Sequence, residues 1–370
     1  MRINVIPQFD LLQKFLRYIL LLLANLRFFS GDILRSESSR VITFLLVLTT
    51  LLSINYKKFN YRYYLILLGC IICNLKFGGP AVPLIIIFLI SSVLAEEKIR
   101  NLSLISLILQ IFFLIYMMLN VGSGSVIEDI VESEKGVTRD LGFGNSNVLG
   151  GFLLSVTATI LFVFAQKQRI KLILNLTLPI VLISFIYTTA RTCFIGEIFM
   201  LVLYLFYAAK CIKMKTISKY AAIFPLVITI VIIIFISSSF QFDLFNKILT
   251  GRPRLWFNHL GYFISEGNLL FGYDHTQTYA VALDCSYLTL FIDNGIIGDG
   301  LYCLFLFIGI KRCNSLYPYY IPIICGLLLS AVMENILLPL SPINLLLITL
   351  MYKCVYHKSL LKEQNITAVS

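Results

Sequence analysis

Long apolar stretches alternate with short polar segments along most of the chain. A helix that crosses the hydrocarbon core of a bilayer needs about 20 apolar residues, with a range of about 17–25. On that basis the hydrophobic pattern predicts about twelve membrane-spanning helices. They are expected near residues 12–29, 41–56, 61–76, 79–95, 102–120, 146–165, 172–190, 192–209, 220–238, 286–310, 317–337 and 342–356. The expected fold is an all-α polytopic membrane protein, with residues 1–370 as a single integral membrane domain.

Composition supports the same fold class. Hydrophobic residues make up 59% of the chain and charged residues only 13%, and the mean hydropathy is +0.89. A water-soluble core cannot bury that much apolar surface, so lipid is the expected solvent. Residues 1–30 are apolar and basic without a small-residue cleavage site, which predicts a retained helix rather than a signal peptide. The nine cysteines fall mostly within apolar runs, where we expect small buried hydrophobes.

The distribution of positive charge predicts which side of the membrane each segment faces. The net charge is +11, but the basic residues form short runs between spans, so no nucleic-acid partner is expected. An excess of Lys and Arg in short loops marks the cytoplasmic face. The runs assigned to this face are Lys57–Arg62, Lys98–Arg100, Lys167–Lys171, Lys210–Lys219, Lys311–Arg312 and Lys353–Lys358, with Arg2, Lys14, Arg17 and Lys362. Both termini are then cytoplasmic, as an even number of spans requires.

The two longest polar stretches, residues 121–145 and 239–285, fall on the opposite, outer side in this topology. Arg139 lies in the first of them, within "TRDLGFGNSNVLGG", and Arg191 lies at the outer seam between two spans, within "IYTTARTCF". Arginine is always charged and binds phosphate or carboxylate in a bidentate fork. Near a bilayer such a group usually has a partner or a ligand. We therefore expect both arginines to bind an anion, with a local pair between Arg139 and Asp140 as the alternative.

The second outer stretch contains "ILTGRPRLWFNHLGYF", in which Arg252 and Arg254 flank a proline. The residues at helical spacing after it are Leu255, His259 and Tyr262. This spacing predicts a short interfacial helix with Trp256 at its rim, because tryptophan favours the membrane–water interface. A contact to lipid phosphate is the alternative for Arg254, and a histidine such as His259 is more often a packing residue than a catalyst.

Acidic residues mark the start and the interior of several predicted spans. Asp284 opens one span and fits a helix N-cap, a role that alone would explain it. The others are Asp293, Asp299, Glu197 and Glu334. Charged groups are expensive in lipid, so these side chains should face the bundle interior or an aqueous cavity. Interior hydrogen bonding explains the two glutamates as well as catalysis does.

Several of these segments together resemble a known family. "LTGRPRLW", "NLLFGYD" and "DCSYLTLFIDNGIIG" follow one another in the order seen in the Wzy-type polymerases of O-antigen and capsular polysaccharide, and are similar to the related O-antigen ligases. The upstream "RDLGFGNSN" and "TTART" look like the arginine-bearing segments of that superfamily. The resemblance covers roughly residues 139–300. It implies a multi-span GT-C-type glycosyltransferase, which joins sugar repeat units carried on undecaprenyl diphosphate at the outer face of the bacterial inner (cytoplasmic) membrane.

The resemblance also implies roles for individual residues. Arg139, Arg191 and Arg252 would meet the donor diphosphate in a shared external vestibule. Asp284 takes the place where the ligases usually have histidine, and Cys285 replaces the usual asparagine. The complete candidate set is Arg252, Asp284 and His275 as catalytic residues, and Arg139, Arg191, Asn147, Arg254, Trp256 and Tyr287 as substrate-binding residues.

The implied reaction is an inverting transfer to a sugar hydroxyl on a second lipid-linked unit, with Asp284 or His275 as the general base. No Asp-x-Asp motif is present, so neither a metal nor another cofactor is expected. The expected partners are undecaprenyl-diphosphate-linked oligosaccharides and the lipid bilayer, with a chain-length regulator and a flippase from the same system.

Two alternatives remain open. An O-antigen ligase would transfer finished chains to the lipid A core, and the aspartate at position 284 in place of histidine argues against it. A transporter or lipid flippase would carry charged residues at the midplane of paired, broken helices. The sequence shows no internal repeat, and its outer polar groups cluster at one face, which favours the polymerase.

Overall fold

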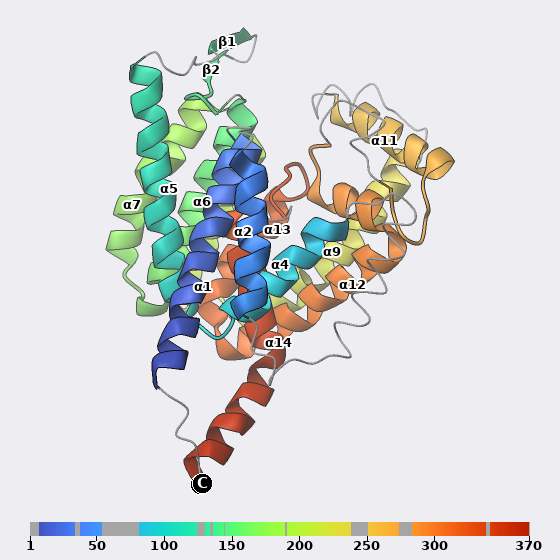
Figure 1. The fold of residues 1–370 in the computed structure, drawn as a ribbon. Coiled ribbons are helices and arrows are strands. Elements are labelled where there is room, and N and C mark those ends of the chain that lie inside the picture. The colour runs from blue at the N-terminus through green and yellow to red at the C-terminus, as the bar shows by residue number, and fades with distance from the viewer. Residues whose placement is uncertain are drawn as a thin grey trace. The chain divides into compact units, whose positions relative to one another are not determined.

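The structure, a computed structural model, describes residues 7–33, 38–53, 81–123, 130–133, 136–143, 145–188, 191–237, 251–273, 283–337 and 341–369. These residues form helices and connecting turns, with one short β-hairpin (Figure 1). The main helices are α1 (Pro7–Arg27), α2 (Ser38–Ser53), α4 (Ala81–Leu94), α5 (Ile99–Gly122), α6 (Ser146–Phe164), α7 (Ile170–Tyr187), α8 (Arg191–Ala208), α9 (Met214–Ser237), α11 (Arg252–Glu266), α12 (Ser286–Leu316), α13 (Ile321–Ser330) and α14 (Pro342–Val369). Short helices η1 (Phe28–Ile33), η3 (Ala165–Lys167) and η4 (Pro318–Tyr320) extend α1 and α6 and precede α13.

The expectation of a helical membrane protein is confirmed in its coarse form. Within the described residues, six helices are long and apolar enough to cross a membrane: α5, α6 with η3, α7, α8, α9 and α12. The remaining apolar helices, including α2 and α13, are shorter. The span expected at 61–76 lies outside the described residues. The total of about twelve spans therefore stays a prediction.

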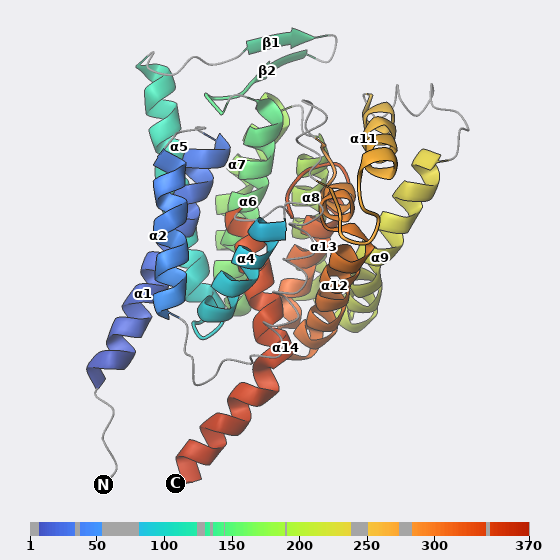
Figure 2. The same cartoon turned by 45° about the vertical axis from the view of Figure 1, so that its right-hand side comes forward.

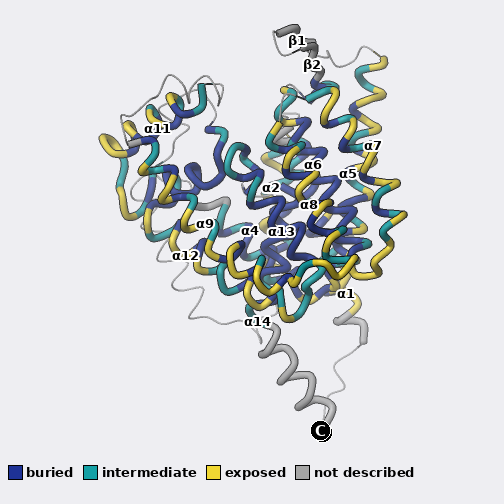
Figure 3. Tube along the Cα trace, turned by 180° about the vertical axis from the view of Figure 1, so that it is seen from behind, coloured by how far each residue is buried: buried dark blue, intermediate teal, exposed yellow. Residues whose placement is uncertain are grey.

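The chain divides into two compact units, which we describe separately. The first comprises Met1–Phe59, Ile86–Glu197 and Pro339–Lys353, and the second comprises Asn60–Ile85, Ile198–Leu338 and Cys354–Ser370. In the first unit, α1 packs on α2 and α5, and α6 packs on both α5 and α7 (Figure 2). Most of α6 is buried, as Figure 3 shows, so it is the central helix of this unit.

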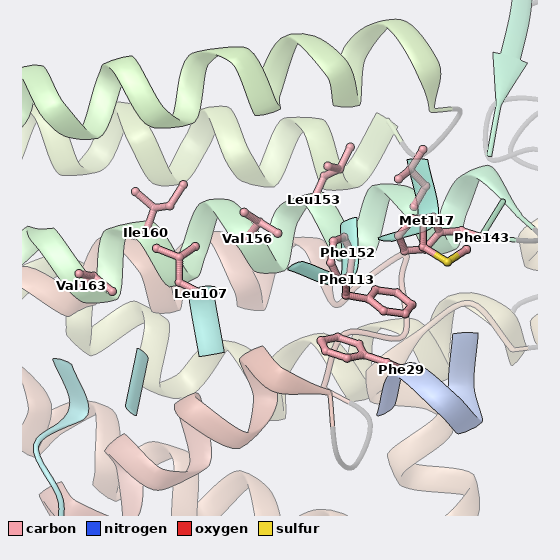
Figure 4. Packing of buried hydrophobic residues seen from close by; sticks show 11 residues of the cluster. Phe29, Leu107, Phe113, Met117, Phe143, Phe152, Leu153, Val156, Ile160 and Val163 are labelled. Atoms are coloured by element: carbon pink, nitrogen blue, oxygen red, sulfur yellow. The ribbon is translucent and has the colours of Figure 1, made fainter. Parts of the chain in front are cut away.

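The core of the first unit is built from aromatic and aliphatic side chains of η1, α5 and α6 (Figure 4). Phe29 and Phe113 stack with their ring centroids 4.3 Å apart and their planes nearly parallel. Phe143, from the turn before α6, packs on Phe152 with the centroids 5.0 Å apart. The first pair joins segments far apart in the sequence, and the second fixes the turn before α6 on that helix. Aromatic pairs add to the energy gained from apolar burial.

Charged residues of the first unit meet in one cluster. Arg17 Nη1 lies 3.0 Å from Glu97 Oε1, and Arg17 also contacts Glu96. Lys353 Nζ donates a hydrogen bond of 2.7 Å to the Glu97 carbonyl oxygen. The charge pattern predicted one and the same side for Arg17, the loop that ends at Arg100, and Lys353, and these three segments are in contact.

The polar stretch 121–145 contains a hairpin that the hydrophobic pattern did not predict. Strand β1 (Ile130–Ser133) pairs antiparallel with β2 (Gly136–Arg139), with Ile130 opposite Arg139. The turn that follows β2 is stabilised by Asp140, which is buried and accepts a hydrogen bond of 2.9 Å from the Gly142 N–H. Two strands of four residues are too short to give a clear alternating pattern, which explains why this hairpin was not predicted.

In the second unit, α12 packs along α9, with α11 and α13 also contacting this pair. Helix α12 is interrupted at Gly295, whose backbone has φ 64° and ψ −175°. The expected interior position of Asp299, just after this break, is confirmed, because the residue is only 5% exposed. Glu334 is buried as well, and in the first unit so is Glu197.

Candidate functional site

Helix α11 presents the arginine segment of the second outer stretch. It begins at Arg252 because Gly251 adopts a left-handed backbone with φ 82° and Pro253 lies at the start of the first turn. Its inward face carries Trp256, His259 and Phe263, all buried. The predicted helix is thus present, but Trp256 is 2% exposed and packs inside the unit, not at a rim. Residues spaced by three and four positions share one helix face, so this buried face begins at Arg252.

Arg252 is the centre of a group of charges drawn from three segments. Its Nη2 lies 3.0 Å from Glu334 Oε1 and 3.9 Å from Asp284 Oδ2. Glu334 follows α13, and Asp284 immediately precedes α12. The exposed fractions of the side chains are 16% for Arg252, 33% for Asp284 and 7% for Glu334. Glu334 is therefore the deeper and closer partner, and Asp284 the more distant and more accessible one.

The segment that carries Glu334 is fastened to the beginning of α12 through Ser286. The Ser286 hydroxyl donates to the Glu334 carbonyl oxygen at 2.7 Å, and it accepts hydrogen bonds from the backbone N–H groups of Ile336 at 2.8 Å and Leu337 at 3.1 Å. The Ser286 N–H donates to the Ala331 carbonyl oxygen at 3.0 Å. A fully buried serine that makes four hydrogen bonds fixes the backbone on both sides of the charge cluster.

A second side-chain contact joins the same two segments. The Asn335 amide donates to the Leu283 carbonyl oxygen, next to Asp284. Thr289 Oγ1 lies 3.3 Å from that same carbonyl oxygen and 3.3 Å from Asn335 Oδ1. Asp284 and Glu334 therefore face Arg252 from two backbones that are tied to each other, so their spacing does not depend on the ion pairs alone.

Asp284 does not cap α12. The N-cap residue is Cys285, and its side chain makes no capping hydrogen bond, so the predicted N-cap role of Asp284 is wrong by one position. Burial raises the pKa of the Asp284 carboxyl above its usual value, and the positive charge of Arg252 offsets part of this shift. Burial also raises the pKa of the Cys285 thiol to about 12, which keeps it neutral at physiological pH. Of the two neighbours, the aspartate is the one that can exchange a proton.

Two further segments of the resemblance meet at the break in α12. The Tyr273 N–H donates to the Ile292 carbonyl oxygen at 2.8 Å. In the other direction, the Ile296 N–H donates to the Leu269 carbonyl oxygen at 3.0 Å, and the Ile297 N–H donates to the Leu270 carbonyl oxygen at 3.2 Å. The loop after α11, Asn268–Tyr273, thus satisfies backbone groups that the interruption leaves without helical partners. We call this arrangement the backbone clasp.

Two glycines make the backbone clasp possible. A Cβ on Gly272 would lie 2.1 Å from the Asp293 carbonyl oxygen, and one on Gly295 would lie 2.5 Å from the Leu270 carbonyl carbon. Both residues also have a positive φ, 94° and 64°, which favours glycine. "NLLFGYD" and "DNGIIG" therefore need glycine because two backbones touch there.

The other predicted site residues are distributed over both units. In the second unit, Tyr287 is buried and its hydroxyl donates to the Leu328 carbonyl oxygen at 2.9 Å, while Arg254 is exposed on α11. His275 lies outside the described residues. In the first unit, Arg191 is exposed at the first position of α8, and the Asn147 N–H donates to Asn145 Oδ1, the N-cap of α6.

Arg139, the last residue of β2, also belongs to the first unit, whereas Arg252 belongs to the second. The shared vestibule for the three arginines therefore stays a prediction. Sequence reasoning missed the contact of Glu334 with Arg252. The signal was the acidic residue in "LLLSAVMENILLPL", which interrupts an apolar run yet could not be assigned a partner from the sequence.

No protein family, curated protein or solved structure matches this chain when it is compared with those already known. Within the described residues, no group of three or more His, Cys, Asp and Glu side chains is arranged to hold a metal ion. Arg252, Asp284 and Glu334 form the charge cluster whose chemistry bears on function.

Proposed function

We propose that the protein is a polysaccharide polymerase. It would join oligosaccharide repeat units carried on undecaprenyl diphosphate at the outer face of the bacterial cytoplasmic membrane, for O-antigen or capsule synthesis. The fold would contain about twelve spans in a GT-C-type arrangement, with both termini in the cytoplasm. The support is the ordered resemblance of residues 139–300 and a helical chain with several spans of sufficient length.

The observation that carries the proposal is the position of Arg252. Arg252 of "TGRPRLW" and Asp284 of "DCSYLT" are 32 positions apart in the sequence (284 − 252), yet they form an ion pair at 3.9 Å. A cation beside a carboxylate whose pKa is raised provides both an anion contact and a proton acceptor. In addition, Nε1 of the buried Trp256 has no hydrogen-bond partner among the described residues, so a donor is available one turn from Arg252.

The chemistry assigned to these groups is a direct displacement. An acceptor sugar hydroxyl attacks the anomeric carbon of the donor, the new carbon–oxygen bond forms as the bond to phosphate breaks, and the diphosphate leaves on its lipid. The hydroxyl proton passes to the Asp284 carboxylate. Arg252 stabilises the negative charge that develops on the departing diphosphate, which is more valuable in a poorly hydrated site than in water. A single displacement inverts the anomeric centre.

The decisive experiment uses cells in which Arg252→Ala replaces the native protein. We expect long-chain polysaccharide to be lost while lipid-linked single repeat units remain, measured by gel profile and by mass spectrometry of extracted lipids. Arg169→Ala, at an exposed position before α7, is the matched control and should leave chain length unchanged. Chains of normal length with stably expressed Arg252→Ala would contradict the proposal.

Deletion of the gene separates this function from the ligase, because a ligase mutant accumulates long lipid-linked chains and a polymerase mutant accumulates only short ones. Purified protein that lengthens lipid-linked glycan without any ion gradient would separate it from a transporter.

A further inference from the structure

The charge cluster contains two carboxylates for one guanidinium, which is an unusual arrangement for a site that receives an anion. With both carboxylates ionised, Arg252, Asp284 and Glu334 together carry a net charge of −1 and would repel a diphosphate. The two carboxylates are not equivalent, however. Glu334 Oε1 is 3.0 Å from Arg252 Nη2 and its side chain is 7% exposed, whereas Asp284 Oδ2 is 3.9 Å away and 33% exposed.

Hydrogen bonds fix the backbone beside both carboxylates. The Glu334 carbonyl oxygen accepts a hydrogen bond from the Ser286 hydroxyl, which in turn accepts from the N–H groups of Ile336 and Leu337. Next to Asp284, the Leu283 carbonyl oxygen accepts a hydrogen bond from the Asn335 amide, so the two carboxylates differ in their distance to Arg252 and in their exposure. Breaking a buried, close pair is costly because it leaves an uncompensated charge, while a partly exposed contact at 3.9 Å is weak.

Both contacts use the same nitrogen of Arg252. Within the described residues, Nη2 meets Glu334 and Asp284, and the guanidinium group has two further nitrogens with donors of its own. One fixed carboxylate can therefore hold the guanidinium plane in place while the other donors bind a phosphate oxygen.

We propose, resting on the function proposed above, that Glu334 is a positioning residue that holds Arg252 for a lipid diphosphate, and that the diphosphate displaces Asp284 from Arg252. Displacement leaves the Asp284 carboxylate next to the reaction centre without its cation, which increases its affinity for a proton. Binding of the donor thus prepares Asp284 to accept the proton of the acceptor hydroxyl. In this arrangement Arg252 pairs with Asp284 before the donor binds and with the leaving diphosphate afterwards.

The test measures binding and not turnover. Full-length protein in lipid nanodiscs is titrated with undecaprenyl diphosphate, and separately with inorganic pyrophosphate to distinguish a lipid headgroup from a free anion. Glu334→Gln should weaken binding of undecaprenyl diphosphate by about tenfold, equivalent to about 1.4 kcal/mol. Asp284→Asn should strengthen it by about threefold, since the competing carboxylate is removed. Glu266→Gln, at the exposed end of α11, is the matched control and should leave the affinity unchanged.

The pH profile supplies a readout that a purely structural role would not change. Arg252 is the charged group that acts on Asp284, the neutral Cys285 thiol adjoins it, and Glu334 shares the Arg252 guanidinium with it. In the wild type, affinity for the diphosphate should increase as the pH falls through the Asp284 pKa, because protonation releases Arg252. In Asp284→Asn this dependence should disappear, while Glu334→Gln should retain it.

The outcomes decide the proposal without depending on the enzymatic assay. Equal weakening by Glu334→Gln and Asp284→Asn, or wild-type affinity in Glu334→Gln, would overturn it even if Arg252→Ala abolishes binding. If Glu334→Gln does not fold, Glu334→Asp is measured instead. This variant moves the carboxylate back by one methylene and should bind undecaprenyl diphosphate with intermediate affinity. Wild-type affinity in Glu334→Asp would contradict the positioning role of Glu334. If the variants behave as expected but the wild type never lengthens glycan, the proposed function fails and the assignment of Glu334 stands.

Discussion

Helices α6 and α12, the central helices of the two units, differ in the residues that they bury and in the continuity of their backbone. Helix α6 is uninterrupted and carries no charged residue, and beyond its first turn its polar side chains are serines and threonines, of which Thr159 donates within the helix to the Ser155 carbonyl oxygen at 2.7 Å. Helix α12 contains Asp293, Gly295 and Asp299 and breaks at the glycine. The backbone hydrogen bonds of α6 are made within the helix. The backbone groups at the break in α12 are instead satisfied by the loop Asn268–Tyr273.

This difference indicates where function lies. Helix α6 keeps a helical backbone along its whole length without support from a neighbouring loop, which fits a supporting role. Helix α12 is interrupted at Gly295, and a partly buried arginine and two carboxylates meet near its first residue, an arrangement that carries an energetic cost. Such departures from consistency are typical of functional sites. Three variants test this contrast between the two units.

The largest effect is expected for Gly272→Ala. The added Cβ would lie 2.1 Å from the Asp293 carbonyl oxygen on a backbone with φ 94°, so the backbone clasp cannot form without moving both chains. Strain of this kind costs about 1–3 kcal/mol before the overlap itself is counted. We expect loss of most folded protein, measured by size-exclusion chromatography in detergent.

The matched control for that substitution is Gly151→Ala in α6, where the added Cβ meets nothing within 4 Å. This variant should elute as the wild type does and melt at the same or a higher temperature, because alanine is favoured over glycine within a helix. Gly261→Ala, on the open side of α11, is a second control in the same unit as Gly272. Normal folding of Gly272→Ala would mean that the backbone clasp does not exist as described.

An intermediate effect is expected in the core of the first unit. Phe113→Leu removes the ring that stacks on Phe29 at 4.3 Å and contacts Phe143 edge to face at 5.8 Å. Loss of the aromatic pairs and imperfect repacking should cost about 1–2 kcal/mol of unfolding free energy. Thermal melting would show this loss, whereas the affinity for undecaprenyl diphosphate should not change, because Phe113 lies in the apolar core and is not a predicted substrate-binding residue. A large decrease in affinity would contradict a purely structural role for this core.

The sequence predicted most of the helices because long apolar runs carry their own signal. The charge pattern assigned Arg17, Lys98–Arg100 and Lys353 to one side, and their segments are in contact, while the membrane side that they face stays a prediction.

The sequence also predicted a helix in the segment of α11 from the spacing of Leu255, His259 and Tyr262, but Tyr262 is exposed and the buried face carries Trp256, His259 and Phe263. It did not predict the role of Glu334, since an ion pair across 82 residues leaves no local pattern. Nor did it predict that Trp256 is buried, because an amphipathic helix of this length fits both a membrane surface and a protein groove.

The smallest effect is expected for the stability of Asp284→Asn. Burial raises the pKa of Asp284 despite the positive charge of Arg252, so ionising this carboxyl costs more in the folded protein than in the unfolded chain. Below the unfolded-state pKa the group is protonated in both states and contributes no difference. As the pH rises through the unfolded and then the folded pKa, the wild type loses stability that the asparagine variant keeps. At neutral pH the variant should therefore be more stable, by less than about 1 kcal/mol because the side chain is one-third exposed.

Thermal melting of both proteins at neutral pH and at a pH below the ordinary aspartate range would measure this difference. The two melting temperatures should coincide in acid and separate at neutral pH, with the variant higher. A variant less stable than the wild type at neutral pH would mean that the ion pair with Arg252 outweighs the cost of burial. Asp284 would then be a fixed structural partner of Arg252, and a diphosphate could not displace it readily. The sign of this small stability difference therefore separates two cases. In one, a diphosphate can replace Asp284 at Arg252. In the other, Arg252 and Asp284 form a permanent ion pair like that of Arg17 and Glu97 in the first unit.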